Sequence, residues 1–160
     1  MDRGYYQRFS DSLTPMETTD APQRLRALPS WLLSQAALQG HRLVSEGLAA
    51  DGLRKYHFTV LLALDEQGPT SQAALGRRLS IDRSDMVAVI NDLEGKGLLV
   101  RSPDPHDRRR NVIALTPAGE QALARLDARV NEAQAALLAA LTERERRDLV
   151  RLLTRVVETR

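Results

Sequence analysis

The spacing of apolar residues along the chain predicts a mainly helical protein. Apolar side chains recur three and four positions apart over long stretches, which places them on one face of a helix. The expected helices run from Ser30 to about Gly47–Gly52, from about Arg54 to Gln67, from Thr70 or Ser71 to Leu79, from Asp82 to Gly95, from Thr116 to about Leu141, and from Thr142 to Val157. Residues 1–27, which are interrupted by prolines, are expected to be an irregular and flexible extension.

Residues suited to helix ends mark several of these boundaries. Ser30 and Asp82 are expected N-caps, and the Asp82 carboxylate is expected to accept the N–H of Asp85. Thr142–Glu145 has the spacing of a capping box at the start of the last helix. Gly68 is suited to end the second helix, because glycine adopts the left-handed cap and the proline after it cannot continue the helix.

Two short runs of β-prone residues, Leu98–Val100 and Val112–Leu115, are typical of strands. They flank the segment SPDPHDRRRN, whose proline, aspartate and asparagine residues suit a hairpin loop, and Thr116 can then cap the helix that follows. A short helix, a tight turn, an amphipathic helix and a hairpin describe a winged helix-turn-helix, which places one helix in the DNA major groove. We therefore expect a mainly α fold with a small β-hairpin wing.

Composition narrows the class of protein without identifying a partner. The 160 residues are 42% hydrophobic but only 4% aromatic, so the core must be built mainly from Leu, Val and Ala. The chain has no stretch of about 18 uncharged apolar residues, no secretory leader and no cysteine. We expect a soluble, cytoplasmic protein. The net charge of +2 does not by itself indicate a nucleic-acid partner.

The expected parts of the chain are an N-terminal extension (1–27), the first helix of a dimerisation region (28–53), a DNA-binding domain (54–118) and C-terminal dimerisation helices (119–160). The apolar stripes on the first and last helices need more partner surface than a small winged module offers. Association of two copies buries them, and a two-fold dimer matches the symmetry of a pseudo-palindromic DNA site. Packing against helices of the same chain is the alternative.

The helix from Asp82 to Gly95 has the two faces that a recognition helix needs. Its apolar residues, at i, i+3, i+4 and i+7, are Met86, Val89, Ile90 and Leu93. The opposite face carries Ser84, Val87, Ala88 and Asn91. Asn91 can form paired hydrogen bonds with adenine, and Val87 and Ala88 can touch a thymine methyl group, while Ser84 and Arg83 can reach a base or a phosphate. A solvated helix face explains this pattern equally well.

The hairpin loop distinguishes these two interpretations. It holds three successive arginines, Arg108, Arg109 and Arg110. Asp107 can brace one of them by a bidentate pair, and a braced arginine suits a narrow minor groove. Arg77 and Arg78, at the end of the preceding helix, add expected phosphate contacts. A run of charged residues usually forms only a solvated loop. A run of arginines on a hairpin directly after a helix of this kind is a more specific indication of DNA binding.

A resemblance to the MarR family of winged helix-turn-helix regulators is carried by LSIDRSDMVAVINDLEGKGLLVR and then DPHDRRRNVIALTPAG. The matching motifs are a D-x-R wing (Asp107 and Arg109) and an L-T-x-x-G signature (Leu115, Thr116 and Gly119). The resemblance extends more loosely over 28–155. It implies an obligate homodimer with interlocked terminal helices. It also implies a regulator, often a repressor, that many members release from DNA when a small, frequently aromatic anion binds.

Weak candidates for contacts to such a ligand fall on the first two helices, where family members often line a pocket: Trp31, His41, Tyr56 and His57. A histidine in such a place is more often a structural hydrogen-bonding group than a ligand contact. Paired with a carboxylate, it would respond to pH. The chain has no cysteine, which excludes the thiol sensing found in one branch of the family.

An enzyme is not expected, because the sequence has no Gly-rich phosphate loop, no His/Asp/Glu cluster with metal spacing and no nucleophile motif. No metal or cofactor is therefore expected. The expected partners are double-stranded DNA, a second copy of the chain and a small effector. Association with a membrane is not expected. The alternative is a winged helix that binds proteins without sequence-specific DNA binding, and such a module has no need for three adjacent arginines beside a bracing aspartate.

Overall fold

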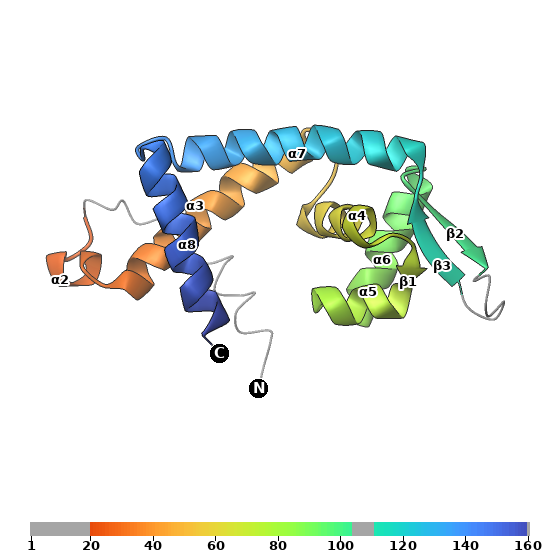
Figure 1. Ribbon diagram of the computed structural model, residues 1–160, viewed down its shortest axis with the longest axis horizontal. Helices are drawn as coiled ribbons and strands as arrows, with labels where there is room; N and C mark the ends of the chain where they lie inside the picture. The colour runs from red at the N-terminus through yellow and green to blue at the C-terminus, as the bar shows by residue number, and fades with distance from the viewer. Residues whose placement is uncertain (1–19, 104–110, 160) are drawn as a thin grey trace. The chain divides into compact units, whose positions relative to one another are not determined.

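A computed structural model describes residues 20–103 and 111–159 and confirms a mainly helical fold with a small antiparallel sheet (Figure 1). The helices are α2 (Gln23–Arg26), α3 (Pro29–Ala49), α4 (Lys55–Gln67), α5 (Gln72–Leu79), α6 (Arg83–Gly95), α7 (Pro117–Leu137) and α8 (Glu143–Glu158), and the strands are β1 (Thr70–Ser71), β2 (Leu99–Pro103) and β3 (Asn111–Leu115). The chain forms two compact units, Val44–Glu132 and the remainder. Within the described residues, none of the helices combines the length and the apolar character that a membrane span requires.

The unit Val44–Glu132, called here the winged unit, is built around one apolar core. Helices α4, α5 and α6, the sheet, the end of α3 and the first part of α7 all contribute to it. The largest fully buried apolar side chains are Leu48, Leu61, Leu75, Met86, Ile90, Leu93, Ile113 and Leu126. Met86, Val89, Ile90 and Leu93 are all buried, so the inward face predicted for α6 is confirmed.

The sheet has three strands rather than the two expected, in the order β1-β3-β2. Thr70 pairs with Ile113 and Ser71 with Val112, which adds β1 to the free side of the hairpin. Ser71 also caps α5, because its Oγ accepts the N–H of Ala74 at 3.3 Å. The prediction of two strands was incomplete, since a strand of two residues has no alternation of apolar and polar positions to reveal it.

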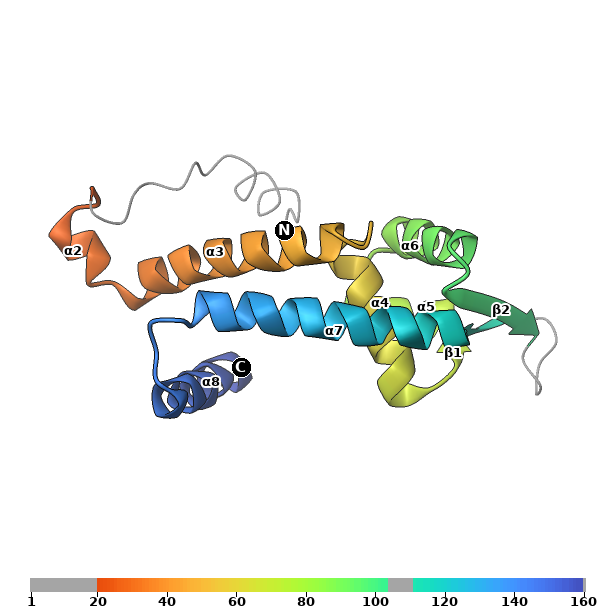
Figure 2. The ribbon, with the colours of Figure 1, turned by 90° about the horizontal axis from the view of Figure 1, so that it is seen from above.

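The turn before the hairpin and the start of α7 are tied together by Thr116. Its hydroxyl donates to the Gly97 carbonyl at 2.7 Å and accepts the Gly119 N–H at 3.0 Å, which confirms the predicted cap. The Thr116 N–H donates to the Leu98 carbonyl at 3.1 Å. A Cβ on Gly119 would lie 2.1 Å from that same carbonyl oxygen. These contacts explain why Thr and Gly occur at this spacing where α7 leaves the sheet (Figure 2).

Two of the predicted helix ends were wrong, one predicted cap bonds a different N–H, and a short helix was missed. Helix α3 starts at Pro29, so Ser30 lies inside the helix and is not its N-cap; proline is favoured at the first helical position because it has no N–H to satisfy. Asp82 does cap α6, but its carboxylate accepts the N–H of Ser84 at 2.9 Å rather than that of Asp85. Helix α2 lies within residues expected to be irregular. Gly68, with φ of 74°, ends α4 as predicted.

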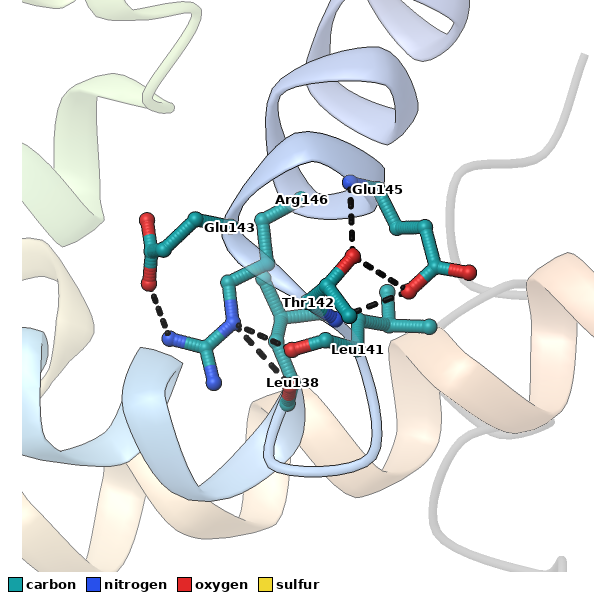
Figure 3. A network of polar contacts seen from close by, with 6 residues as sticks. All are labelled: Leu138, Leu141, Thr142, Glu143, Glu145 and Arg146. Atoms are coloured by element: carbon teal, nitrogen blue, oxygen red, sulfur yellow. Dashed lines mark hydrogen bonds and ion pairs between the residues drawn. The ribbon is translucent and has the colours of Figure 1, made fainter.

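The second wrong end is that of α7, which stops at Leu137 instead of continuing to Leu141. Arg146 donates from Nε to the carbonyls of Leu138 at 3.2 Å and Leu141 at 3.1 Å, and this closes the turn between α7 and α8 (Figure 3). The predicted capping box of α8 is confirmed: the Thr142 hydroxyl accepts the Glu145 N–H at 3.4 Å, and the Thr142 N–H donates to the Glu145 carboxylate at 2.8 Å.

Candidate nucleic-acid interface

The outward face of α6 is exposed along the length that the sequence predicts. Arg83, Ser84, Val87, Ala88 and Asn91 are all exposed, opposite the buried face. The Asp82 carboxylate also accepts a hydrogen bond from the Ser84 hydroxyl at 2.7 Å, so the hydroxyl hydrogen is used within the chain and the Ser84 oxygen can still accept a hydrogen bond. The helix therefore has a fixed N-terminus and a face of short side chains that allow its backbone to approach another surface closely.

Arg101 on β2 is bonded to two side chains of α6 and was not identified from the sequence. Its Nη2 donates to Asn91 Oδ1 at 2.6 Å, and its Nη1 pairs with Glu94 Oε2. Alternation along β2 places Arg101 on the same side of the strand as buried Leu99, opposite Ile113 of β3. That alternation was the signal available in the sequence, because an arginine two positions after an inward leucine points toward the helix that covers the sheet.

The two arginines at the end of α5 are exposed in the last turn of the helix, as expected. Arg78 donates from Nη1 to the Gln67 side chain at the end of α4, which fixes its position beside the turn that leads to β1. Ser80, with φ of 52°, ends α5 in the left-handed conformation and starts the tight turn toward α6. Arg77 and Arg78 thus lie on the exposed end of the first helix of the helix-turn-helix.

The tip of the predicted wing lies outside the described residues. Asp107, Arg108, Arg109 and Arg110 belong to the segment 104–110, and their proposed contacts stay predictions. The structure describes the strands on both sides of that segment, which pair in register as far as Pro103 and Asn111. The two strands that flank this segment therefore form a regular antiparallel pair.

His57 is a buried structural residue, only 1% exposed. Its Nδ1 accepts the Arg54 N–H at 3.0 Å, and its Nε2 lies 3.1 Å from Asp92 Oδ2 on α6. Burial lowers the pKa of His57 below 6.5; the Asp92 carboxylate opposes this shift, and Arg54 and Lys96 add to it. Both ring nitrogens are used within the winged unit, so His57 has no group left for a ligand and the structural interpretation is favoured.

The other three ligand candidates are not brought into one cluster within either unit. Tyr56 is exposed on α4 of the winged unit. Trp31 is half-buried and His41 is exposed, both on the part of α3 that belongs to the other unit. These three residues therefore remain candidate ligand contacts, and none of them lines a described pocket. Among the described residues there is also no group of three or more His, Cys, Asp or Glu side chains able to hold a metal ion.

A shallow depression on the winged unit involves none of these candidates. It is lined by Asp51, Arg125, Ala128, Arg129 and Glu132. Asp51 pairs with both arginines, at 3.4 Å from Arg125 Nε and 3.9 Å from Arg129 Nε. The charges in this depression are thus already matched within the chain.

Comparison with known proteins agrees with this geometry. The MarR family model matches residues 51–110, a range that includes α4, β1, α5, α6 and β2 and ends before β3. The chain is 45% identical over 86 residues to a protein of Thauera aromatica described as a transcriptional regulator of the hcr operon; the match covers 54% of this chain and 52% of that protein. The chain thus spans about half the length of this relative.

Two solved structures resemble most of the chain. The transcriptional repressor CouR, bound to a 23-mer DNA duplex, is 31% identical with a TM-score of 0.75, over 85% of this chain and 96% of that one. BpsR of Bordetella bronchiseptica, whose DNA binding is regulated by 6-hydroxynicotinic acid, is 26% identical with a TM-score of 0.72, over 88% and 100% of the two chains. Both are DNA-binding proteins.

Proposed function

Because this chain belongs to the MarR family, we propose that it is a DNA-binding transcriptional regulator, and specifically a repressor, that reads its operator with α6. The observation that carries this proposal is the exposed face of α6, where Ser84, Val87, Ala88 and Asn91 lie opposite the buried apolar face. Short side chains let the helix enter the major groove, and an amide and a hydroxyl supply polar contacts to base edges. Arg83, exposed at the start of the helix, is proposed to bond a guanine or a phosphate.

The phosphate contacts come from elements on both sides of α6. Arg77 and Arg78 lie at the exposed end of α5. On the other side the hairpin carries Arg108, Arg109 and Arg110, with Asp107 to brace the extended arginine for the minor groove. Each phosphate contact releases condensed counterions, so affinity should fall steeply with salt.

A homodimer is proposed because the terminal helices expose apolar surface. The exposed large apolar residues on and beside α3 and α8 are Leu28, Leu32, Leu33, Val150, Leu152, Val156 and Val157. Helix α8 is amphipathic yet buries none of its residues within one chain. Such a surface favours association through residues 28–53 and 119–160 of two copies. Sedimentation as a monomer at micromolar concentration would contradict the dimer.

A small effector is proposed to release the protein from DNA, and an aromatic acid is the chemical class. Support comes from BpsR, which is similar over 88% of this chain and whose DNA binding is regulated by 6-hydroxynicotinic acid. Trp31, His41 and Tyr56 are the candidate contacts, since they supply aromatic surface and a hydrogen-bonding ring outside the core. A thermal-shift screen of aromatic carboxylates, followed by a DNA-release assay, tests this part.

The central experiment is a fluorescence anisotropy titration of the full chain with the DNA upstream of its own gene, repeated at several salt concentrations. Tight binding to one duplex and weak binding to a scrambled duplex of the same composition is expected. Equal, weak binding to both would favour the alternative function, a winged helix that binds another protein.

A further inference from the structure

We propose that Arg101 determines the base specificity of α6 by making Asn91 a hydrogen-bond donor toward DNA. The inference rests on the proposed function, because it concerns the base that the exposed face of α6 selects. In this arrangement Asn91 favours guanine or thymine, and the paired contact with adenine that asparagine commonly makes is disfavoured.

The position of Arg101 is fixed from three directions. The pairing of β2 with β3 places its backbone opposite buried Ile113. Its guanidinium reaches α6, where Nη1 pairs with Glu94 and Nη2 donates to Asn91 Oδ1 at 2.6 Å. The side chain is only 24% exposed. Because Asn91 and Glu94 lie three positions apart, both face the strand from the same side of the helix, and the planar guanidinium spans them.

The chemistry of this contact fixes the orientation of the Asn91 amide. A guanidinium has donors only, so the atom of the amide that faces it must be the oxygen. A hydrogen bond from a charged donor is about twice as strong as a neutral one. The amide is thus held with its NH2 group directed away from Arg101.

This orientation changes what Asn91 can recognise. Paired contact with adenine needs the amide oxygen to accept from the adenine N6 amino group while the NH2 group donates to N7. Here the oxygen is held by a cation, which also repels a second donor beside it. The NH2 group stays available, and its natural partners are the acceptor-rich edge of guanine, at N7 and O6, or thymine O4.

The test uses a set of operator duplexes with all four bases at each position of the half-site, titrated with the full-length wild type, Asn91→Ala and Arg101→Met. Asn91→Ala should lose a preference of about tenfold at one position, where the wild type prefers guanine or thymine. Arg101→Met keeps an unbranched apolar stem in place of the aliphatic part of arginine but removes the donors that hold Asn91. It should shift the preference at that same position toward adenine, with an unchanged dependence on salt.

A second measurement keeps the proposal testable if Arg101→Met does not fold. With wild-type protein, 7-deazaguanine at a guanine selected by Asn91 removes the N7 acceptor and should weaken binding about tenfold. If adenine occupies that position, its replacement by purine, which lacks the 6-amino group, should have no effect; a loss would show the paired contact and overturn the proposal.

Three further results would contradict either the role of Arg101 or the proposed function. An unchanged base preference in folded Arg101→Met, or in Asn91→Ala, would overturn the role assigned to Arg101 while leaving DNA binding intact. A weaker salt dependence in Arg101→Met would show that the arginine leaves Asn91 to contact phosphate. A wild type that binds all duplexes equally would instead contradict the proposed function itself, and the two failures are therefore distinguishable.

Discussion

His57 Nε2 lies 3.1 Å from Asp92 Oδ2, which joins the start of α4 to the last turn of α6 inside the winged unit. On its other side, His57 Nδ1 accepts the N–H of Arg54, the N-cap residue of α4. A neutral ring with its proton on Nε2 satisfies both contacts. Protonation of Nδ1 would place two hydrogens against each other at the cap, so one protonation state supports both the helix end and the link to α6.

The stability of the winged unit is expected to depend on pH through His57. Burial lowers the pKa of His57 in the folded state below the ordinary value of 6.5. The unfolded chain therefore binds more protons between the two pKa values, and the free energy of unfolding rises with pH in that interval. The contribution of His57 is present above about pH 6.5 and is lost as the pH falls through the lower, folded-state pKa. Urea denaturation at a series of pH values from about 7.5 down to 5 measures this dependence.

A matched pair of histidine substitutions isolates the effect. His57→Gln removes the titration but leaves a side chain able to accept at the N-cap, so the pH dependence should become flatter. His41→Gln makes the same chemical change at an exposed position of α3 and should leave the dependence as in the wild type. Identical pH profiles for all three proteins would show that His57 is not the titrating group.

Gly119 is expected to tolerate no side chain. Its Cβ would lie 2.1 Å from the Leu98 carbonyl oxygen, a backbone atom that cannot move without disturbing the turn before β2. Gly119→Ala should therefore lower the free energy of unfolding by about 3 kcal/mol. Gly95→Ala is the control at the end of α6, where nothing lies within 4 Å of the added Cβ; it should be neutral or slightly stabilising. Equal urea midpoints for the two variants would contradict the close approach.

Local signals in the sequence were sufficient for much of this fold. The inward face of α6 followed from four apolar residues at helical spacing, and the ends at Gly68, Thr116 and Thr142 followed from cap chemistry that acts within a few residues. The position of α6 before the β2–β3 pair could be predicted for the same reason. Each of these features is determined by neighbours along the chain.

The features that were missed depend on contacts between distant residues. The pairing of Thr70 with Ile113 creates β1, and no pattern within two residues can indicate it. The bond between Arg101 and Asn91 needs the hairpin to fold back on α6. His57 was considered as a ligand contact because its burial arises only when α4 and α6 pack together. The contacts of the wing, including those of Arg109, stay predictions.

Thr142 is expected to stabilise α8 through its cap. Its hydroxyl accepts the Glu145 N–H, and the hydrogen bonds from Thr142 lower the pKa of the Glu145 carboxyl group (Figure 3). Thr142→Ala should cost about 1 kcal/mol of helix stability. Thr154→Ala is the matched control in the same helix, where the hydroxyl donates to the Val150 carbonyl and caps no helix end, and it should have little effect. Helix content measured by circular dichroism during thermal unfolding separates the two; similar curves would argue against the capping role.

Arg109 in the wing is expected to contribute more to DNA affinity than Arg144, an arginine on the terminal helix α8. If the hairpin tip enters the minor groove, Arg109→Ala removes a contact in a region of enhanced negative potential and should weaken operator binding about tenfold or more. Arg144 lies on α8 with its side chain 89% exposed and 4.0 Å from Asp148, so Arg144→Ala changes the net charge equally without touching the winged unit. Anisotropy titrations at several salt concentrations should also show the salt slope reduced by about one for Arg109→Ala alone. Equal losses in the two variants would show that only net charge is sensed and that the wing does not dock as proposed.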